Sequence, residues 1–170
     1  LRWVDAADID DHTLLAAMRA SSSTPLFTAN IEEIEGRSYN DGMIHAGVPF
    51  RKATEDGCTH VVALLTRQHG YRKRNTLFSL AAEHTILRIR SYPKPYRDAF
   101  FGRIDAYNQT LDALYAGDGP AALIIAPESE DYVLSNSETR RPQLLRTAQE
   151  SMRRTAAVFD VSELRLPGEG

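Results

Sequence analysis

Apolar residues recur at helical spacing near the start of the chain. The members of this stripe are Leu14, Leu15 and Met18. Asp10 and Asp11 come just before it, and an aspartate in that position can cap the first turn of a helix with its carboxylate. The serines that follow Ala20 favour loop geometry. The pattern therefore predicts a helix that begins near Asp10 and ends near Ala20, with the stripe as its apolar face.

The next elements are short. Residues 26–40 alternate in polarity at Ile31 and Ile34, with a turn signal at 35–37, and we predict a short hairpin or an irregular strand pair there. Pro49 suits the first turn of a following helix, and Gly57 suits the position just after its end.

Two short runs are apolar at nearly every position. They are HVVALL at residues 60–65 and AALIIAP at residues 121–127. A run of this length and composition is typical of a strand that is covered on both faces, as in a parallel sheet flanked by helices. A polar, basic loop is expected over residues 66–75. Because helices and buried strands alternate along the chain, we predict the α/β class.

Three more helices are predicted in the second half by apolar positions that share a face. The first stripe is Leu77, Leu80, Ala81, His84 and Leu87. The second follows the sequence YPKPY and consists of Phe100, Ile104, Tyr107, Leu111 and Leu114, with Gly117 closing the helix. The third is Leu145, Ala148, Met152, Ala156 and Phe159, with Pro142 in the first turn and a frayed tail beyond it.

Composition narrows the classes of function. The chain has 170 residues, 42% of them apolar and 25% charged, and a net charge of -3. That balance gives no bulk attraction to nucleic acid, and no apolar run approaches the length of about 20 residues that spans a bilayer. The single cysteine, Cys58, excludes an intrachain disulfide and suits a reducing compartment, so we expect a cytoplasmic protein. The five histidines have no metal-ligand spacing, and no metal site is expected.

Asp41 is the residue of greatest chemical interest. It precedes Gly42, and an Asp-Gly pair alone favours a simple turn by about three to one. In such an Asx turn the carboxylate accepts a hydrogen bond from the backbone N–H two residues on. In open α/β sheets, however, loops beyond strand ends are where sites are built. The carboxylate is therefore either a turn-former or the working group of an active site.

The motifs around Asp41 resemble, in order and spacing, the second half of the patatin-like phospholipase domain. The matching pieces are Ala20-Ser21, Pro25, Tyr39, Asp41-Gly42, Pro49, Ala53, Gly57 and the apolar strand that ends in Thr66-Arg67. Downstream, the sequences GYRK, SYPKPY, RIDAYNQTL and IIAP resemble the helical C-terminal extension of one bacterial branch of that family. The resemblance covers nearly the whole chain.

The resemblance implies part of a three-layer α/β/α sandwich. Residues 1–75 would be the C-terminal part of the patatin-like domain, and residues 76–170 a mostly helical extension with one added strand. It also implies a lipid acyl hydrolase with a Ser–Asp dyad and no cofactor, in which Asp41 is the base that takes the proton of a serine in a Gly-x-Ser-x-Gly elbow. The family has Gly or Ala where this chain has Met43, whose side chain either narrows the site or packs outward.

The nucleophile and the oxyanion loop are missing from the sequence. Gly-x-Ser-x-Gly occurs nowhere in residues 1–170, and the ten glycines form no glycine-rich loop. A base without its nucleophile has nothing to activate, and without oxyanion donors a large electrostatic contribution is lost. The chain opens on Leu1 and reads like the middle of a longer protein. We expect the missing groups on an absent N-terminal half and no ester hydrolysis by these 170 residues alone.

A basic cluster is the weak candidate for substrate binding. Its members are Arg67, Arg72, Lys73 and Arg74. Such charge runs are more often a solvated loop, here by about two to one. The alternative is attraction of phosphate headgroups to the rim of the site, with peripheral membrane contact as a further expectation.

Other candidates have ordinary explanations. The serines Ser21, Ser22 and Ser23 lack a strained glycine elbow, and a helix-ending role is favoured by about ten to one. His45 is expected to be a solvated loop imidazole, and Cys58 an inert thiol in the core. The arginines of the last helix are expected on a hydrated face: Arg140, Arg141, Arg146, Arg153 and Arg154.

Two hypotheses from different classes remain. The first is the C-terminal fragment of a patatin-like acyl hydrolase that acts on lipid or other acyl esters. The second is a non-catalytic α/β domain that binds a lipid headgroup or a protein, with Asp41 as a turn residue. A fragment would expose a sheet edge and apolar faces. We therefore expect association with the missing half or with a second copy.

Overall fold

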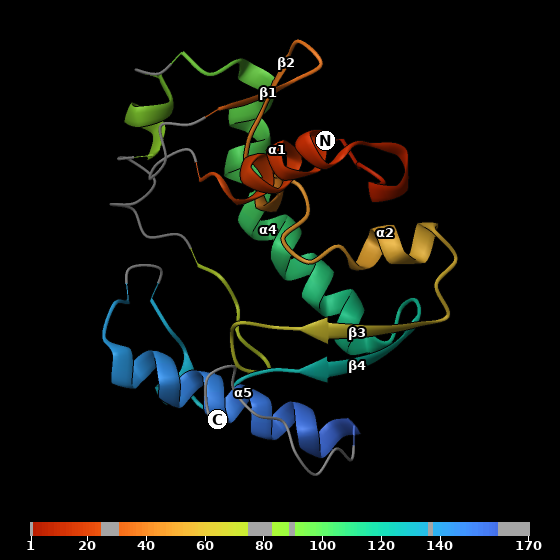
Figure 1. The fold of residues 1–170 in the computed structure, drawn as a ribbon, viewed down its shortest axis with the longest axis vertical. Coiled ribbons are helices and arrows are strands. Elements are labelled where there is room, and N and C mark those ends of the chain that lie inside the picture. Colours follow the sequence, from red (N-terminus) through yellow and green to blue (C-terminus); the bar gives the residue numbers. More distant parts are fainter. Residues whose placement is uncertain (1, 25–30, 75–82, 89–90, 136–137, 160–170) are drawn as a thin grey trace. The chain divides into compact units, whose positions relative to one another are not determined.

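The computed structural model describes residues 2–24, 31–74, 83–88, 91–135 and 138–159 (Figure 1). The helices are η1 (Ala6–Asp8), α1 (Asp11–Ser22), η2 (Gly42–Ile44), α2 (Phe50–Glu55), α4 (Lys94–Ala116), η3 (Glu130–Tyr132) and α5 (Arg141–Phe159), and residues 83–88 are also helical. The strands are β1 (Glu32–Ile34), β2 (Arg37–Tyr39), β3 (His60–Leu64) and β4 (Ala121–Ile125). The chain is thus a mixed α/β protein.

The chain divides into two compact units, and neither is continuous in sequence. The first unit combines Leu1–Arg51 with Lys73–Ala116, and the second combines Lys52–Arg72 with Gly117–Gly170. The predicted division into a patatin-like part and an extension at residue 75 concerns family membership and stays a prediction.

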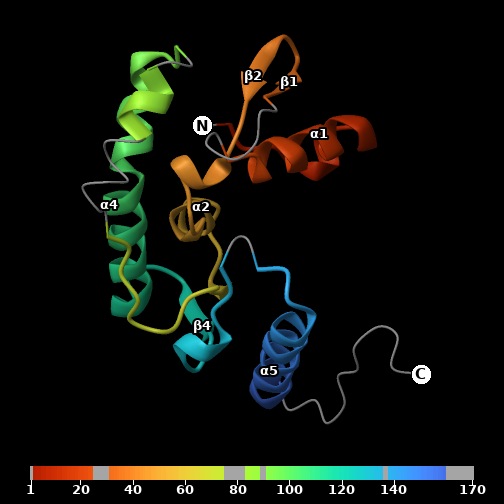
Figure 2. The same cartoon turned by 90° about the vertical axis from the view of Figure 1, so that its left-hand side faces the viewer.

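The helix cap and the hairpin predicted in the first unit are present in the structure. Asp10 caps α1, and its carboxylate accepts a hydrogen bond from the Thr13 N–H at 2.7 Å. Strands β1 and β2 form an antiparallel hairpin in which Ile34 pairs with Arg37. The two residues between them, Glu35 and Gly36, both have positive φ, as a tight hairpin turn requires. Figure 2 shows how β2 leads through η2 into α2.

The apolar face predicted for α1 is wrong. Leu15 and Met18 are 55% and 60% exposed, whereas the small residues Ala16 and Ala20 are buried. The helix therefore packs through its alanines, which permit a close approach of neighbouring backbone. Its leucine and methionine form an uncovered apolar surface instead.

The core of the first unit lies against α4. The predicted stripe is confirmed in α4 by the burial of Phe100, Leu111 and Leu114. Phe100 packs with Ile44 of η2 and with Leu87, which is fully buried. Because η2 is anchored in this cluster, the residue just before it, Asp41, has a fixed position. Leu77, Leu80 and Ala81 of the preceding stripe, Pro25 of the resemblance and the C-terminal tail lie outside the described residues.

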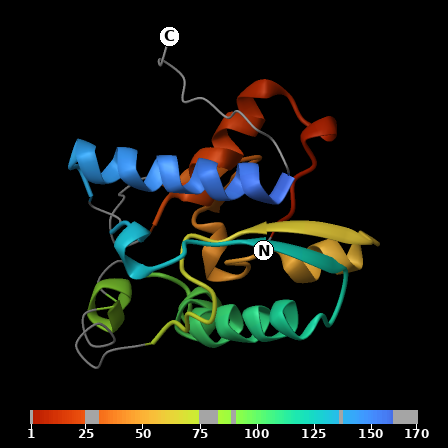
Figure 3. The same cartoon turned by 90° about the horizontal axis from the view of Figure 1, so that it is seen from below.

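Strands β3 and β4 of the second unit pair in parallel, as predicted, and Figure 3 shows them side by side. His60 pairs with Ala121 and Leu64 with Ile125, and the Leu65 N–H extends the ladder by donating to the Ile125 carbonyl at 2.8 Å. The expectation that both faces of these strands are covered is wrong. Val62 and Leu123 are exposed, and Leu64 is 71% exposed, so one face of this sheet is largely open.

Two further expectations in the second unit need correction. The stripe predicted as the apolar face of α5 is covered only in part, because Ala148, Met152 and Ala156 are half-buried whereas Leu145 and Phe159 are exposed. The most buried residue of this helix is Glu150, which is only 8% exposed. Cys58 is exposed rather than a core thiol. It follows Gly57, whose φ of +76° ends α2 as predicted, and the chain has not yet entered the sheet there. No described helix combines the length and apolarity needed to cross a bilayer.

Candidate active site

Asp41 stands between β2 and η2, where the chain turns from the hairpin into the core. Its carboxylate Oδ1 accepts a hydrogen bond from the Met43 backbone N–H at 3.0 Å and so caps η2. This is the bond of an Asx turn. It is the only hydrogen bond that the described residues donate to the carboxylate, and it leaves Oδ2 able to accept a proton from a neighbouring group.

Asp41 differs from an ordinary surface turn residue in its backbone conformation and in its burial. Its φ is +27°, in a region that residues with a Cβ rarely adopt, and backbone strain of this kind persists only where the surrounding structure enforces it. The residue is also only 6% exposed. Burial raises the pKa of the carboxyl group above its ordinary value, while the Met43 N–H and the positive charges of Lys73 and Arg103 act in the opposite direction.

Asp41 lines a cavity of about 270 Å³. The cavity walls come from α1, the hairpin, η2 and the start of α4, all of them in the first unit. The polar residues on the wall are Arg2, Ser21, Ser38, Tyr39, Asn40, Asp41, His45 and Tyr96. The carboxylate therefore belongs to the wall of a cavity and not to an open surface loop.

Gly42 allows the end of α1 to reach this site. A Cβ at that position would lie 2.9 Å from the Ser21 Oγ, closer than side-chain atoms approach one another. Ser22 and Ser23 have the predicted helix-ending role, since both hydroxyls donate to carbonyls of the preceding turn. Ser21 differs from them because it lines the Asp41 cavity, which its place in a run of serines did not indicate.

Tyr96, at the start of α4, is another polar residue on the wall of this cavity. Its ring stacks on Tyr92 with centroids 4.5 Å apart, and its hydroxyl is buried without a well-formed hydrogen bond. Burial is the main cause that raises the pKa of Tyr96, with the Asn40 side chain acting against it and the Asp41 charge adding to it. The phenol thus stays neutral and holds a hydrogen-bond donor on the cavity wall.

Met43 and His45 leave the carboxylate unobstructed. Met43 does not line the Asp41 cavity; its side chain is exposed and its Sδ lies 3.3 Å from the Lys73 Nζ. Of the two placements open to it, it packs outward. His45 is exposed at the cavity edge, and burial of part of its ring lowers its pKa, which favours the neutral imidazole at pH 7.

The members of the basic cluster belong to different units of the chain. Lys73 belongs to the first unit, where its Nζ lies 4.1 Å from the Tyr107 ring centroid and its charge acts on Asp41. Arg67 and Arg72 belong to the second unit, where Arg67 lines a different cavity. Arg74 is exposed. Lys73 is therefore the cluster member that the structure links to the candidate active site.

The chemistry available at this site is proton transfer. A buried carboxylate with a raised pKa is a better base near neutral pH than an ordinary aspartate. Among the described residues no group of three or more His, Cys, Asp or Glu side chains could hold a metal ion. The serines on the cavity wall lie outside any glycine elbow.

Comparisons of the chain with protein-family models, with curated proteins and with solved structures find no match. The likeness to the patatin-like family therefore rests on the motifs of the sequence itself.

Proposed function

We propose that this chain is the C-terminal part of a patatin-like lipid acyl hydrolase and that Asp41 is the base of its Ser–Asp dyad. The observation that carries the proposal is the state of Asp41: buried, conformationally strained, with a raised pKa, and on the wall of a cavity. Perturbed groups of this kind cluster at functional sites. The three-layer sandwich implied by the resemblance is part of the same proposal.

In the proposed reaction Asp41 acts through the oxygen that does not bond Met43. It takes the proton of a serine hydroxyl as the serine oxygen attacks the carbonyl carbon of the ester. The same proton passes to the departing alcohol when the acyl–serine bond is complete. In the second half of the reaction, Asp41 takes a proton from a water molecule whose oxygen attacks the acyl carbonyl carbon. The proton returns to the serine oxygen as the carboxylic acid leaves, so the free enzyme is restored.

The exposed apolar groups of the first unit support the proposal that a further segment packs against this chain. A cavity of about 530 Å³ on this unit has a largely apolar wall that includes Trp3, Met18 and Met43, all exposed. In the second unit, β3 and β4 each pair on one side only within the described residues. Parallel sheets normally continue beyond two strands and are covered on both faces. We propose that a further segment carrying the nucleophile completes this structure.

Ester hydrolysis by the product of the intact gene tests the proposal. We expect turnover of p-nitrophenyl esters and of phospholipid, and a loss of about a hundredfold to ten-thousandfold in kcat in Asp41→Asn, since the base contributes about 10²–10⁴-fold and its amide cannot accept the proton. The 170-residue chain alone is expected to be inactive. Turnover that survives Asp41→Asn, or turnover by the 170-residue chain, would contradict the assignment.

One observation favours the second hypothesis, a non-catalytic domain that binds a lipid headgroup or a protein. The hydrogen bond from the Met43 N–H is what a turn-forming aspartate makes. On that hypothesis Asp41→Ala only weakens the fold, and the intact gene product has no hydrolase activity to lose. The activity assay therefore separates the two.

A further inference from the structure

A further cavity lies in the second unit, at the carboxyl ends of the two parallel strands. Its volume is about 510 Å³, within the range of small-molecule sites. Leu64 and Ile125, the last residues of β3 and β4, form one wall, and the inner face of α5 forms the other. In α/β sheets ligands bind beyond the carboxyl ends of strands, so this is where a site is expected.

The cavity combines an apolar wall with cations. The apolar residues are Leu64, Leu65, Ile125, Ala126, Pro127, Tyr132 and Leu134. The ionisable residues with charge at pH 7 are Arg67, Arg154 and Glu150. The lining thus carries one more positive than negative charge.

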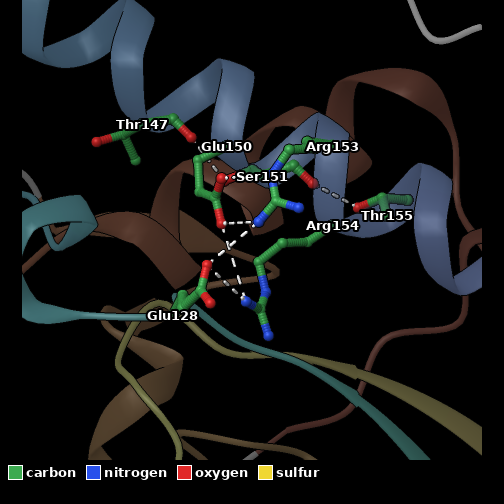
Figure 4. Close-up of polar contacts among 7 residues, drawn as sticks. All are labelled: Glu128, Thr147, Glu150, Ser151, Arg153, Arg154 and Thr155. Carbon is green, nitrogen blue, oxygen red and sulfur yellow. Dashed lines mark hydrogen bonds and ion pairs between the residues drawn. The ribbon is translucent and has the colours of Figure 1, made fainter.

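Glu150 is already neutralised by its own neighbour. Arg153 donates to both of its carboxylate oxygens, at 2.8 and 2.9 Å, and its second nitrogen also reaches Glu128 at 3.2 Å. Figure 4 shows these side chains of α5 converging on Glu128. A carboxylate held in this two-pronged way has little capacity left to bind a cationic ligand.

The cavity keeps unused hydrogen-bond donors. The guanidinium of Arg154 is 3.5 Å from Glu128 and 3.8 Å from Glu150 and donates no hydrogen bond within the described residues. Arg67 stacks on Tyr71 at 5.3 Å and has no ion pair in the described part of the chain. The Thr147 hydroxyl is buried and makes no hydrogen bond to the residues that the structure describes. A buried polar group without a partner is costly.

We propose that this cavity binds a small organic anion, a single carboxylate or phosphate group on an apolar body. Arg154 and Arg67 hold the anionic group, and the strand-end leucines and isoleucine with Tyr132 cover the body. The site uses none of the residues around Asp41 and does not rest on the proposed hydrolase activity.

Calorimetric titration of the full 170-residue chain at low salt tests the site. The probes are octanoate and octyl phosphate, with octanol and octylammonium as matched neutral and cationic compounds and inorganic phosphate as the head group alone. We expect saturable binding of at least one octyl anion, and binding at least about tenfold weaker for octanol, for octylammonium and for phosphate. The tighter of the two octyl anions identifies the head group. Added salt is expected to weaken binding.

Arginine variants locate the binding. Arg154→Gln and Arg67→Gln are each expected to weaken the anion about tenfold to a hundredfold, the loss of a charged hydrogen bond. Arg67→Gln breaks no ion pair of the described residues, so it remains informative if Arg154→Gln perturbs folding. Arg141→Gln is the matched control, because Arg141 is exposed on the same helix and does not line the cavity.

Three results would overturn the proposal. They are octanol binding as tightly as the octyl anions, unchanged affinity in both Arg154→Gln and Arg67→Gln, and loss of binding in Asp41→Asn. Loss of binding in Asp41→Asn would place the anion in the Asp41 cavity of the first unit, and it would not contradict the hydrolase proposal. Conversely, an inactive gene product that binds the anion through Arg67 and Arg154 would remove the hydrolase proposal alone.

Discussion

Replacement of Asp41 by asparagine is expected to stabilise the fold at neutral pH while it removes the proposed base. The asparagine oxygen can still accept the hydrogen bond from the Met43 N–H, so the cap of η2 is kept. The substitution removes only the charge, and burial disfavours that charge in the folded state. A residue that serves only a turn has no such charge penalty to relieve.

Whether the Asp41 charge stabilises or destabilises the fold follows from the direction in which its pKa is shifted. Burial raises the pKa of Asp41 above its ordinary value of 3.8. Below that value the carboxyl group is protonated in both the folded and the unfolded chain, and it contributes nothing to the pH dependence. As the pH rises, the unfolded chain loses this proton first, so stability falls until the folded carboxyl has also titrated. The advantage of Asp41→Asn therefore grows as the pH rises above 3.8 and levels off once the folded carboxyl group has also titrated.

The free energy of unfolding depends on Asp41 in two ways, through its charge and through its hydrogen bond to the Met43 N–H. The charge penalty amounts to about 1.4 kcal/mol for each unit by which the pKa is displaced. Asp41→Ala removes the same charge but also the cap, and we expect it to be less stable than Asp41→Asn by about 1 kcal/mol at every pH. The difference between the two variants isolates the hydrogen bond, and the difference between asparagine and wild type isolates the charge.

Urea unfolding between pH 4 and pH 7 measures both parts. The single tryptophan, Trp3, lies in the first unit, so its fluorescence reports the unit that holds Asp41. Two results would contradict this expectation: Asp41→Asn less stable than wild type at pH 7, or a difference between them that does not change with pH. Either result would mean that burial does not disfavour the charge of Asp41 in the folded chain.

Three further predictions concern packing and buried polar groups. Gly42→Ala is expected to lower the free energy of unfolding by about 1 kcal/mol or more, and Ser21→Ala in the same chain should restore part of it, as a double-mutant cycle by urea unfolding would show. Thr147→Val should raise stability by about 1 kcal/mol in thermal melts, because it removes a buried hydroxyl without a partner among the described residues; a loss would show that this hydroxyl is satisfied. Arg103→Met should cost about 3–5 kcal/mol, since it leaves the buried Glu83 carboxylate without its 2.7 Å partner. Glu83→Met in the same chain should recover most of that loss, and no recovery would contradict the ion-pair explanation.

Features set by neighbouring residues could be predicted from the sequence. The Asp10 cap, the Glu35-Gly36 turn and the end of α2 at Gly57 each depend on a few adjacent residues with strong conformational preferences. The two short apolar runs indicated strands of a parallel sheet, and β3 and β4 are such strands. Asp41 was singled out in the sequence by the Asp41-Gly42 pair and the motifs around it, and its role as a base stays a prediction.

Features set by distant partners could not be predicted. Periodicity gives the apolar face of a helix but not whether another element covers it, and Leu15 on α1 and Leu145 on α5 are exposed. The burial of Glu150 depends on its salt bridge with Arg153 and on the sheet that α5 faces. Tyr96 reaches the Asp41 cavity only because the start of α4 folds back on the hairpin and η2. No local pattern marks such contacts.

Active-site labelling of the intact gene product shows whether Asp41 activates a serine. A fluorophosphonate probe reacts covalently with an activated serine, and mass spectrometry of the digested protein locates it. We predict one labelled serine, in a Gly-x-Ser-x-Gly elbow outside residues 1–170, and no labelling in Asp41→Asn. A label on Ser21, a label that persists in Asp41→Asn, or no labelled serine at all would contradict the assignment of Asp41 as the base of a dyad.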